Sequence, residues 1–215
     1  MLKRAIDIVV SATALVVLSG LMLVVALLVR LVLGAPVLFT QDRPGRGGRI
    51  FKLYKFRTMH NANGPDGQPL ADHERASTFG NRLRALSLDE LPQLWNVLKG
   101  DMSLVGPRPL LVVYLDRYTP EQARRHEVRP GITGLAQISG RNNLPWDERL
   151  GLDVRYVDQQ SLWVDLKIMM KTAQRLIKPE GVNQEGHAVG GEMFLGSAAN
   201  TEINRDDDGR LKEVA

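Results

Sequence analysis

The chain has 215 residues, enough for one ordinary domain with an accessory segment and a sizeable core. It contains no cysteine, which excludes disulfides and thiolate metal sites and favours a cytoplasmic location. The net charge of +4 is uneven: residues 1–60 carry nine Lys or Arg and two acids, whereas 180–215 carry three Lys or Arg and eight acids. Positive charge beside an apolar segment is typical of contact with anionic lipids, and a nucleic-acid-binding arm would lack that apolar neighbour.

The first predicted element is a membrane helix. Residues 8–29 form a run of 22 without a charge, and a straight helix of that length would be roughly 33 Å long, enough for the apolar core of a bilayer. Basic residues flank the run on both sides, so the positive-inside rule puts both ends in the cytoplasm. Ser19 and Gly20 lie near its middle, where both weaken a helix. A re-entrant helix over 1–34, broken at Ser19 and Gly20, satisfies both observations; a straight spanning helix and a cleaved signal peptide are the alternatives.

Short strands and helices are predicted for the rest of the chain. Extended segments over 37–40 and 50–57 are joined by a turn rich in Gly and Pro, and a polar loop follows over 61–72. Helices are expected over 87–99, from Pro120 with Thr119 as N-cap, over 146–159 and over 162–177. Trp146 and Trp163 belong either at a membrane interface or in the core.

The expected fold class is therefore mainly α with a few short β-strands, an α+β domain. We expect three parts: the membrane-embedded re-entrant helix over 1–34, a small catalytic domain over 35–180, and a polar, acidic tail over 181–215. The tail has few large apolar residues, so we expect it to be loosely held.

The acidic pair Asp89 and Glu90 has two interpretations. With Ser87 it fits a capping box, in which Glu90 reaches back to the Ser87 amide. Against a simple cap, Pro92 removes an amide that the first helical turn needs, so that turn should be distorted. Three arginines also bracket the pair, more than a cap requires: Arg82, Arg84 and Arg108.

Further basic side chains point to phosphate binding. Arg108 lies between two prolines, and a guanidinium with a restricted direction suits bidentate phosphate binding. Its alternative is a salt bridge to Asp101 or another carboxylate. Lys55 and Arg57 are expected on one face of a strand, where as an isolated pattern they would be solvated surface.

Carboxylates and basic groups around one helix start indicate a metal and a phosphate. Two carboxylates can share a site with a diphosphate only if a cation such as Mg²⁺ bridges them. One carboxylate is then free to attack phosphorus and form an acyl phosphate, which divides one difficult transfer into two easier ones. Residue types alone leave a transferase and a phosphatase equally open.

Four motifs follow one another in the sequence: SLDELPQL at 87–94, NVLKGDMS at 96–103, GPRP at 106–109 and RPGITG at 129–134. Together they resemble the bacterial sugar transferase family, the monotopic phosphoglycosyl transferases, in their small form. The resemblance covers roughly residues 1–190. It implies an enzyme of the bacterial inner membrane whose catalytic domain lies on the cytoplasmic face.

The resemblance also implies a reaction and its residues. Asp89 matches the nucleophile that takes a phosphosugar from a UDP-sugar and releases UMP, after which polyprenyl (undecaprenyl) phosphate accepts the phosphosugar. Glu90 matches the acid implied to hold Mg²⁺. The matching basic positions near the phosphates are Lys55, Arg84, Arg108 and Arg141.

Two details of the resemblance concern the membrane segment and the sugar. The family's re-entrant helix is often broken at Ser-Pro, where this chain has Ser19 and Gly20. Residues 140–146 resemble members that transfer N-acetylated amino sugars, including di-N-acetylbacillosamine, in glycoprotein or exopolysaccharide assembly. The expected partners are the two substrates and membrane lipids, with no nucleic acid, and the oligomeric state stays open. The alternatives are a non-catalytic membrane adaptor that binds anionic lipids and a membrane-bound phosphatase.

Overall fold

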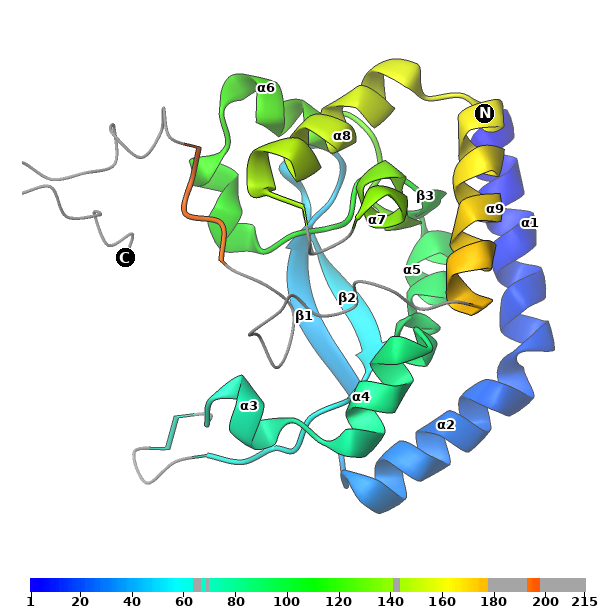
Figure 1. Ribbon diagram of the computed structural model, residues 1–215. Helices are drawn as coiled ribbons and strands as arrows, with labels where there is room; N and C mark the ends of the chain where they lie inside the picture. Colours follow the sequence, from blue (N-terminus) through cyan, green and yellow to red (C-terminus); the bar gives the residue numbers. More distant parts are fainter. Residues whose placement is uncertain (64–66, 69, 141–143, 178–192, 198–215) are drawn as a thin grey trace, which may run out of the picture.

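The computed structural model describes residues 1–63, 67–68, 70–140, 144–177 and 193–197. Within them the chain is mainly helical with two small two-stranded sheets, as predicted (Figure 1). The elements in chain order are α1 (Leu2–Val17), α2 (Ser19–Val32), β1 (Leu38–Pro44), η1 (Arg46–Gly48), β2 (Ile50–Phe56), α3 (Asp72–Arg75), α4 (Thr78–Ala85), η2 (Leu88–Glu90), α5 (Gln93–Lys99), β3 (Ser103–Val105), η3 (Val112–Arg117), α6 (Pro120–Ala123), η4 (Arg124–His126), β4 (Gly131–Thr133), α7 (Leu135–Ser139), α8 (Trp146–Gln159) and α9 (Leu162–Ile177), where η is a 3₁₀ helix.

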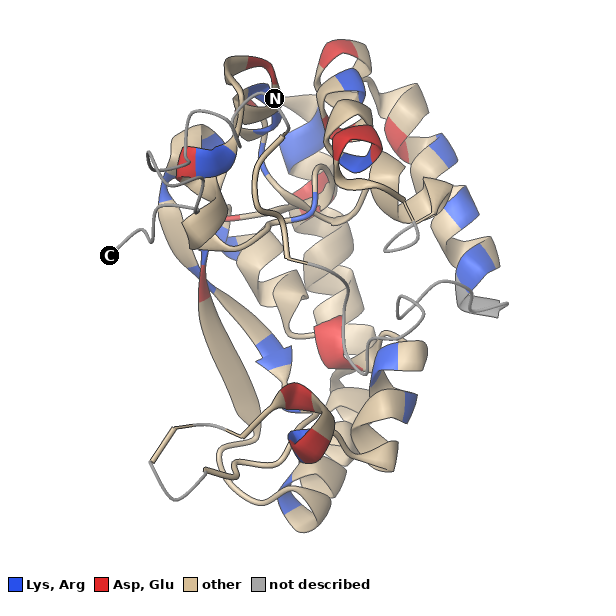
Figure 2. Cartoon of the chain, turned by 60° about the vertical axis from the view of Figure 1, so that its left-hand side comes forward, with Lys and Arg blue, Asp and Glu red and all other residues tan. Residues whose placement is uncertain are grey.

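The apolar N-terminal run forms two helices, α1 and α2, bent by 62° at Leu18. The predicted break lies one residue later, and Ser19 Oγ donates to the carbonyl of Val16 at 2.8 Å, a local bond that competes with regular helix. This pair has few charged residues and is therefore drawn mostly in tan in Figure 2. Among the described residues no single helix has the length and hydropathy of a membrane span, whereas the bent pair taken together does.

The beginning of α1 is bonded to the domain that follows. Lys3 Nζ forms a 2.6 Å ion pair with Asp165 of α9. The Arg4 guanidinium donates to two carbonyls in the last turn of α5, at 2.6 and 2.8 Å, and such oxygens have no partner within their own helix. These two basic residues, which the sequence placed beside lipid, therefore have protein partners.

The end of α2 is bonded to the same domain. Arg57, 5% exposed, donates to the carbonyls of Leu33 and Ala35 just after the helix. Val25 and Val29 are buried where α2 packs against β2 and α4. The expectation that Arg57 is solvated surface is wrong, because the end of α2 needs donors for its last carbonyls.

The strands β1 and β2 form the predicted hairpin, with Leu38 opposite Phe56 and Pro44 opposite Ile50. The first strand is longer than the expected 37–40. Its polar second half looks like a turn in the sequence, yet an ion pair of 3.0 Å between Asp42 and Lys52 links the two strands there.

The parallel pair β3 and β4 fixes the start of the loop that carries Arg108. Gly106 N donates to the carbonyl of Thr133 at 2.9 Å. A Cβ on Gly106 would lie 2.3 Å from the carbonyl oxygen of Arg129, so only glycine permits this close approach. The backbone of residues 106–107 is thereby held against β4.

Residues 193–197 lie against the domain, which differs from the loosely held tail expected there. Phe194 is 1% exposed and packs on Trp146, so that tryptophan is partly buried against the core. Trp163 on α9 is 60% exposed instead. The remainder of 181–215 lies outside the described residues, so the tail over that range stays a prediction.

Candidate active site

The segment around the acidic pair is not the predicted capping box. Ser87 has a left-handed φ of 55° and makes no capping bond through its side chain. Glu90 ends the short helix η2, and α5 begins only at Gln93, after Pro92. The single helix predicted over 87–99 is therefore wrong, although the distortion expected from Pro92 is confirmed, because proline has no amide to continue the helical bonds.

Glu90 instead makes two ion pairs with residues distant in sequence. Its Oε1 accepts from Lys55 Nζ on β2 and from Arg108 Nη2 in the loop after β3, both at 2.7 Å. Lys55 Nζ also lies 3.8 Å from Asp89 Oδ2. The structure thus brings together Asp89, Glu90, Lys55 and Arg108, which we call the ion cluster.

The ion cluster is partly open to solvent. The side chains of Asp89 and Glu90 are 7% and 15% exposed, and that of Arg108 is 44% exposed. A charged ligand can therefore reach the guanidinium while the two carboxyl groups stay largely shielded from water. The alternative for Arg108, a salt bridge to Asp101 or another carboxylate, is wrong for Asp101, which pairs with Lys99 at 2.7 Å. It is confirmed for another carboxylate, because Arg108 pairs with Glu90.

The surroundings push the pKa values of the two acids in opposite directions. Burial is the largest influence on Asp89 and raises the pKa of its carboxyl, against the charge of Lys55. Burial also acts to raise the pKa of Glu90, but the charges and hydrogen bonds of Arg108 and Lys55 outweigh it, and that pKa lies well below its ordinary value. Two neighbouring carboxyl groups whose pKa values are shifted in opposite directions are suited to different chemical roles.

The Glu90→Gln variant should be less stable than the wild type near neutral pH, with the difference becoming smaller as the pH falls below about 4.5. The folded pKa of Glu90 is depressed, so its ion pairs contribute fully above the ordinary pKa of 4.5, and the contribution is lost as pH falls toward the folded value. Thermal unfolding of both proteins from about pH 7 to about pH 3 measures this. Glu121→Gln, on an exposed glutamate, is the control. A constant difference at all pH values would contradict the assignment.

Arg43 of β1 lies near the ion cluster, although its place in the sequence indicates only a basic flank of the membrane segment. Its guanidinium donates to the carbonyl of Pro109 at 3.2 Å and to Gln41 Oε1 at 2.6 Å. Burial, and then the charge of Arg108, lower the pKa of Arg43 to about 10. The two arginines therefore lie in range of one another, an arrangement that an anion would stabilise.

A buried ion pair behind Arg108 was also missed. Arg125 and Asp153 are each 2% exposed, and Arg125 Nε and Nη2 lie 3.1 and 2.7 Å from Asp153 Oδ2. The same Nη2 donates to the carbonyl oxygen of Arg108 at 2.6 Å. The two residues come from η4 and α8, and their charges look like ordinary helix surface in the sequence.

The other two predicted phosphate-binding residues, Arg84 and Arg141, are not part of the ion cluster. Arg84 donates to Asn81 Oδ1 at 2.7 Å and forms no ion pair with Asp89 or Glu90. Burial lowers the pKa of Arg84 while the charge of Asp89 raises it, so the two groups are in electrostatic range. Arg141 lies outside the described residues.

The donor atoms at the ion cluster fit Mg²⁺ only in part. Over the described ranges, no group of three or more His, Asp or Glu could hold a metal ion. Asp89 and Glu90 supply hard carboxylate oxygens, and Mg²⁺ is commonly held by one or two carboxylates with substrate phosphates and water. Both ion pairs of Glu90 fall on Oε1. The pair therefore fits the ion if phosphate oxygens complete its coordination.

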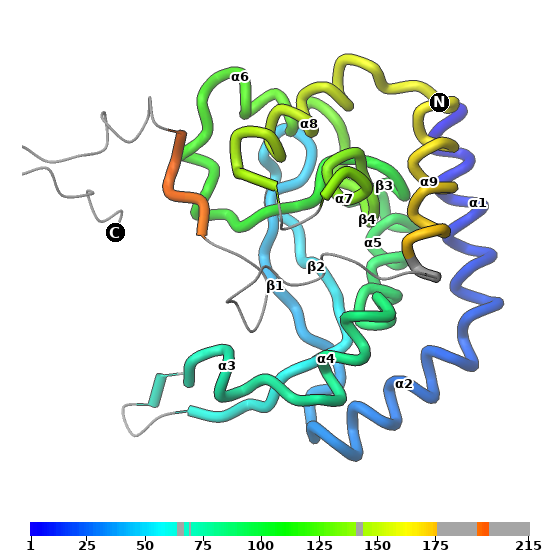
Figure 3. The backbone as a smooth tube through the Cα atoms, in the orientation of Figure 1, coloured from blue at the N-terminus to red at the C-terminus, as the bar shows by residue number. Residues whose placement is uncertain are grey.

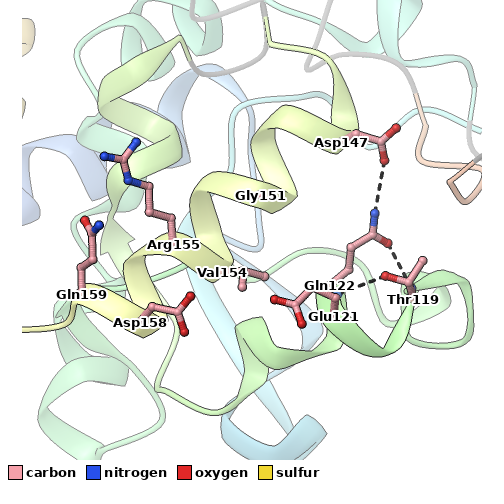
Figure 4. Close-up of a pocket in the computed structure, with 9 residues that line it drawn as sticks. All are labelled: Thr119, Glu121, Gln122, Asp147, Gly151, Val154, Arg155, Asp158 and Gln159. Atoms are coloured by element: carbon pink, nitrogen blue, oxygen red, sulfur yellow. Dashed lines mark hydrogen bonds between the residues drawn. The ribbon is translucent and has the colours of Figure 1, made fainter.

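A groove of about 410 Å³ lies elsewhere, between α6 and α8 (Figure 4). Its rim includes Gln122, which donates to Asp147 at 3.2 Å. The residues that line the groove include no member of the ion cluster and no predicted site residue. We therefore place the candidate active site at the ion cluster.

Comparison with known proteins bears on what this site does. A protein of Bacillus subtilis, the uncharacterized sugar transferase EpsL, is 51% identical over 196 residues, which are 91% of this chain and 96% of that protein. The UDP-glucose:undecaprenyl-phosphate glucose-1-phosphate transferase of Caulobacter vibrioides is 44% identical, over 81% of this chain and 69% of its own.

A longer relative, the UDP-N-acetylgalactosamine-undecaprenyl-phosphate N-acetylgalactosaminephosphotransferase of Aeromonas hydrophila, is 40% identical over 82% of this chain and 44% of its own length. The model of the bacterial sugar transferase family matches residues 1–179. This range contains the bent helix pair and the whole ion cluster. The family indicated by the four motifs is thus confirmed: the chain belongs to the bacterial sugar transferases.

Proposed function

We propose that this chain transfers a phosphosugar from a UDP-sugar to polyprenyl phosphate, releases UMP, and forms a covalent intermediate on Asp89. The observation that carries the proposal is the buried Asp89 carboxyl beside Glu90, Lys55 and Arg108, with the pKa values of the two acids displaced in opposite directions. The names of relatives that act on UDP-glucose and on undecaprenyl phosphate support the substrate classes.

In the first step a carboxylate oxygen of Asp89 attacks the phosphorus that carries the sugar. A bond between oxygen and phosphorus forms, the bond from that phosphorus to the bridging oxygen breaks, and UMP leaves with the electron pair. In the second step a phosphate oxygen of the lipid attacks the same phosphorus and Asp89 is released as a carboxylate. One difficult displacement is thereby divided into two.

The basic residues would bind and orient the diphosphate. Glu90 holds Lys55 and Arg108 together before substrate arrives, and such prior organisation avoids a reorganisation cost during the reaction. Arg108 is the most exposed of the three and would contact phosphate oxygens first. Glu90 would hold Mg²⁺ together with phosphate oxygens of the substrate, and the ion would neutralise diphosphate charge when bound.

The proposal is tested by following UMP release. With a UDP-sugar alone, the purified protein should release about one UMP per active site, as expected for a covalent intermediate, and polyprenyl phosphate should make release continuous. Free inorganic phosphate without a lipid acceptor would favour a phosphatase, and the absence of any UMP would favour the adaptor. The screen should include UDP-glucose and N-acetylated amino sugars, because the named relatives differ in sugar. The segment that suggests an amino sugar, 140–146, lies partly outside the described residues.

We also propose that the bent pair is a re-entrant anchor in the bacterial inner membrane, with the catalytic domain on the cytoplasmic face. Support comes from Arg4 and Arg57, which bond the two ends of the pair to one domain. Those bonds cannot form across a bilayer, so a straight span would break one set of them. The basic residues on both sides of the apolar run agree with this topology.

Cysteine labelling tests this topology, since the natural chain has no cysteine. Leu2→Cys and Gly151→Cys occupy exposed positions at the start of α1 and on α8. In closed vesicles both should react with an impermeant maleimide from the same side. Gly20→Cys, at the bend, should be protected until detergent is added. Labelling of the first two positions from opposite sides would exclude the re-entrant anchor.

A further inference from the structure

Residues 193–197, which we call the clasp, insert a single side chain into an aromatic pocket. Phe194 is 1% exposed, whereas its neighbours Met193 and Leu195 are 58% and 51% exposed. The clasp lies against the domain near α6 (Figure 3). It also lies beyond the region that matches the family, which ends at residue 179.

Three aromatic rings surround the Phe194 ring. The distances between ring centroids are 5.6 Å to Tyr114, 5.6 Å to Tyr118 and 5.3 Å to Trp146. These separations are those of favourable aromatic pairs. Leu110 and Leu150 complete the cluster, so the pocket is formed by α8, η3 and the residues on either side of η3.

The backbone of Phe194 is also bound. Its carbonyl accepts from Arg117 Nη1 at 2.6 Å, and its amide donates to Tyr114 Oη at 3.2 Å. Ser197 Oγ donates to Asp147 Oδ1 at 2.9 Å. Side chains of the domain thus satisfy both backbone groups of the anchor residue, which fixes the clasp in one register.

A chain of contacts leads from Phe194 to the ion cluster. Tyr118 stacks on Phe194 with 23° between the ring planes. The Tyr118 hydroxyl oxygen accepts from Arg125 Nη1 at 3.3 Å, and Arg125 Nη2 donates to the carbonyl of Arg108 at 2.6 Å. Arg108 in turn binds Glu90. The Phe194 ring therefore packs against the ring of Tyr118, and the hydroxyl of Tyr118 binds Arg125.

We propose that Phe194 is a positioning residue: by filling the aromatic pocket, the clasp holds Tyr118 and Arg125 where they fix Arg108 for the phosphates of the donor. Its kinetic consequence rests on the proposed function, whereas its docking does not. Removing the ring leaves Tyr118 without its stacking partner and lets Arg125 and the Arg108 backbone shift. Arg108 would then bind the donor phosphates less well, and the binding of donor should suffer more than the chemistry.

The test uses full-length protein with Phe194→Ala and Phe194→Leu. Met193→Ala and Leu195→Ala are matched controls, because both change an exposed apolar neighbour of the same clasp. Replacing the exposed Trp95 and Trp163 by Phe leaves Trp146, 5.3 Å from the Phe194 ring, as the only tryptophan reporter.

Two readouts separate docking from positioning. Phe194→Ala should shift Trp146 emission to longer wavelength, and kcat/KM for the UDP-sugar should fall by about 10-fold to 100-fold, as small misplacements of binding groups do. Most of this fall should be in KM, and Phe194→Leu should recover much of it. The two control variants should change neither the emission nor the kinetics.

Other outcomes overturn the inference. A merely structural role would lower the active fraction and kcat with KM unchanged, and this result would refute positioning. Unchanged Trp146 emission in Phe194→Ala would refute docking. If the wild type released no UMP from any UDP-sugar, the proposed function would fail and the positioning role with it, while Trp146 emission would still decide whether the clasp docks.

Discussion

Asp89→Asn is expected to abolish UMP release while the protein still folds. The amide cannot form the covalent bond to phosphorus, and loss of a catalytic nucleophile can lower kcat by a factor on the order of 10⁶. The unfolding free energy near pH 7 should be unchanged or higher. Burial raises the folded pKa of Asp89 above the ordinary 3.8, so at neutral pH the ionised carboxylate opposes folding, and neutral asparagine removes that cost.

Kinetics, unfolding and mass spectrometry together check this expectation. Wild-type protein incubated with a UDP-sugar and no lipid acceptor should carry a phosphosugar adduct on Asp89, and the variant should carry none. Asp42→Asn, on an exposed acid of the hairpin, is the control that should retain activity. Asp89→Ala excludes activity that arises from deamidation of asparagine. Turnover by the alanine variant would remove Asp89 as the nucleophile and favour direct attack by the lipid phosphate.

Local patterns in the sequence predict much of this fold. The helix after Thr119 begins at Pro120 with the expected N-cap, in which Thr119 accepts from the Gln122 amide. The last two long helices, α8 and α9, also have the expected bounds. Each of these features depends on residues within about two helical turns, where apolar periodicity and capping act.

The same reasoning fails where a distant partner competes with a local one. The sequence around Ser87 satisfies a capping box, yet Glu90 bonds to Lys55 and Arg108. Ion pairs with two cations hold a largely buried carboxylate more strongly than one backbone amide does. Glu90 can bond to these two residues only because β2 and the loop after β3 lie beside η2. No local sequence pattern contains that arrangement.

Residues whose role depends on partners distant in the sequence are still harder to recognise from local sequence patterns. Phe194 lies in a glycine-rich, acidic stretch whose composition predicts a loose tail, and one aromatic side chain does not change that average. Arg125 has further basic residues beside it in the sequence and looks like a solvated face. Only packing shows that it is buried against Asp153 and behind Arg108.

Asp153→Ala is expected to be the most destabilising of the substitutions considered. Arg125 would keep its charge at 2% exposure without its carboxylate partner. Removal of one member of a buried ion pair typically costs about 3–5 kcal/mol of unfolding free energy. Asp158→Ala is a matched control on the same helix, because Asp158 is 51% exposed and pairs with Arg124 at the surface. Such exposed pairs contribute about 0–1 kcal/mol, so urea unfolding should separate the two variants clearly.

A double substitution distinguishes the stabilising role of this pair from its role at the site. Arg125→Met with Asp153→Leu removes both charges, and replacing a buried ion pair by apolar residues is often neutral or stabilising. Stability should therefore return toward that of the wild type. UMP release should stay impaired, because methionine cannot donate to the Arg108 carbonyl that Arg125 now holds at 2.6 Å. Recovery of full activity together with stability would mean that the pair supports only the fold, and that the prolines and the bond to Glu90 suffice to direct Arg108.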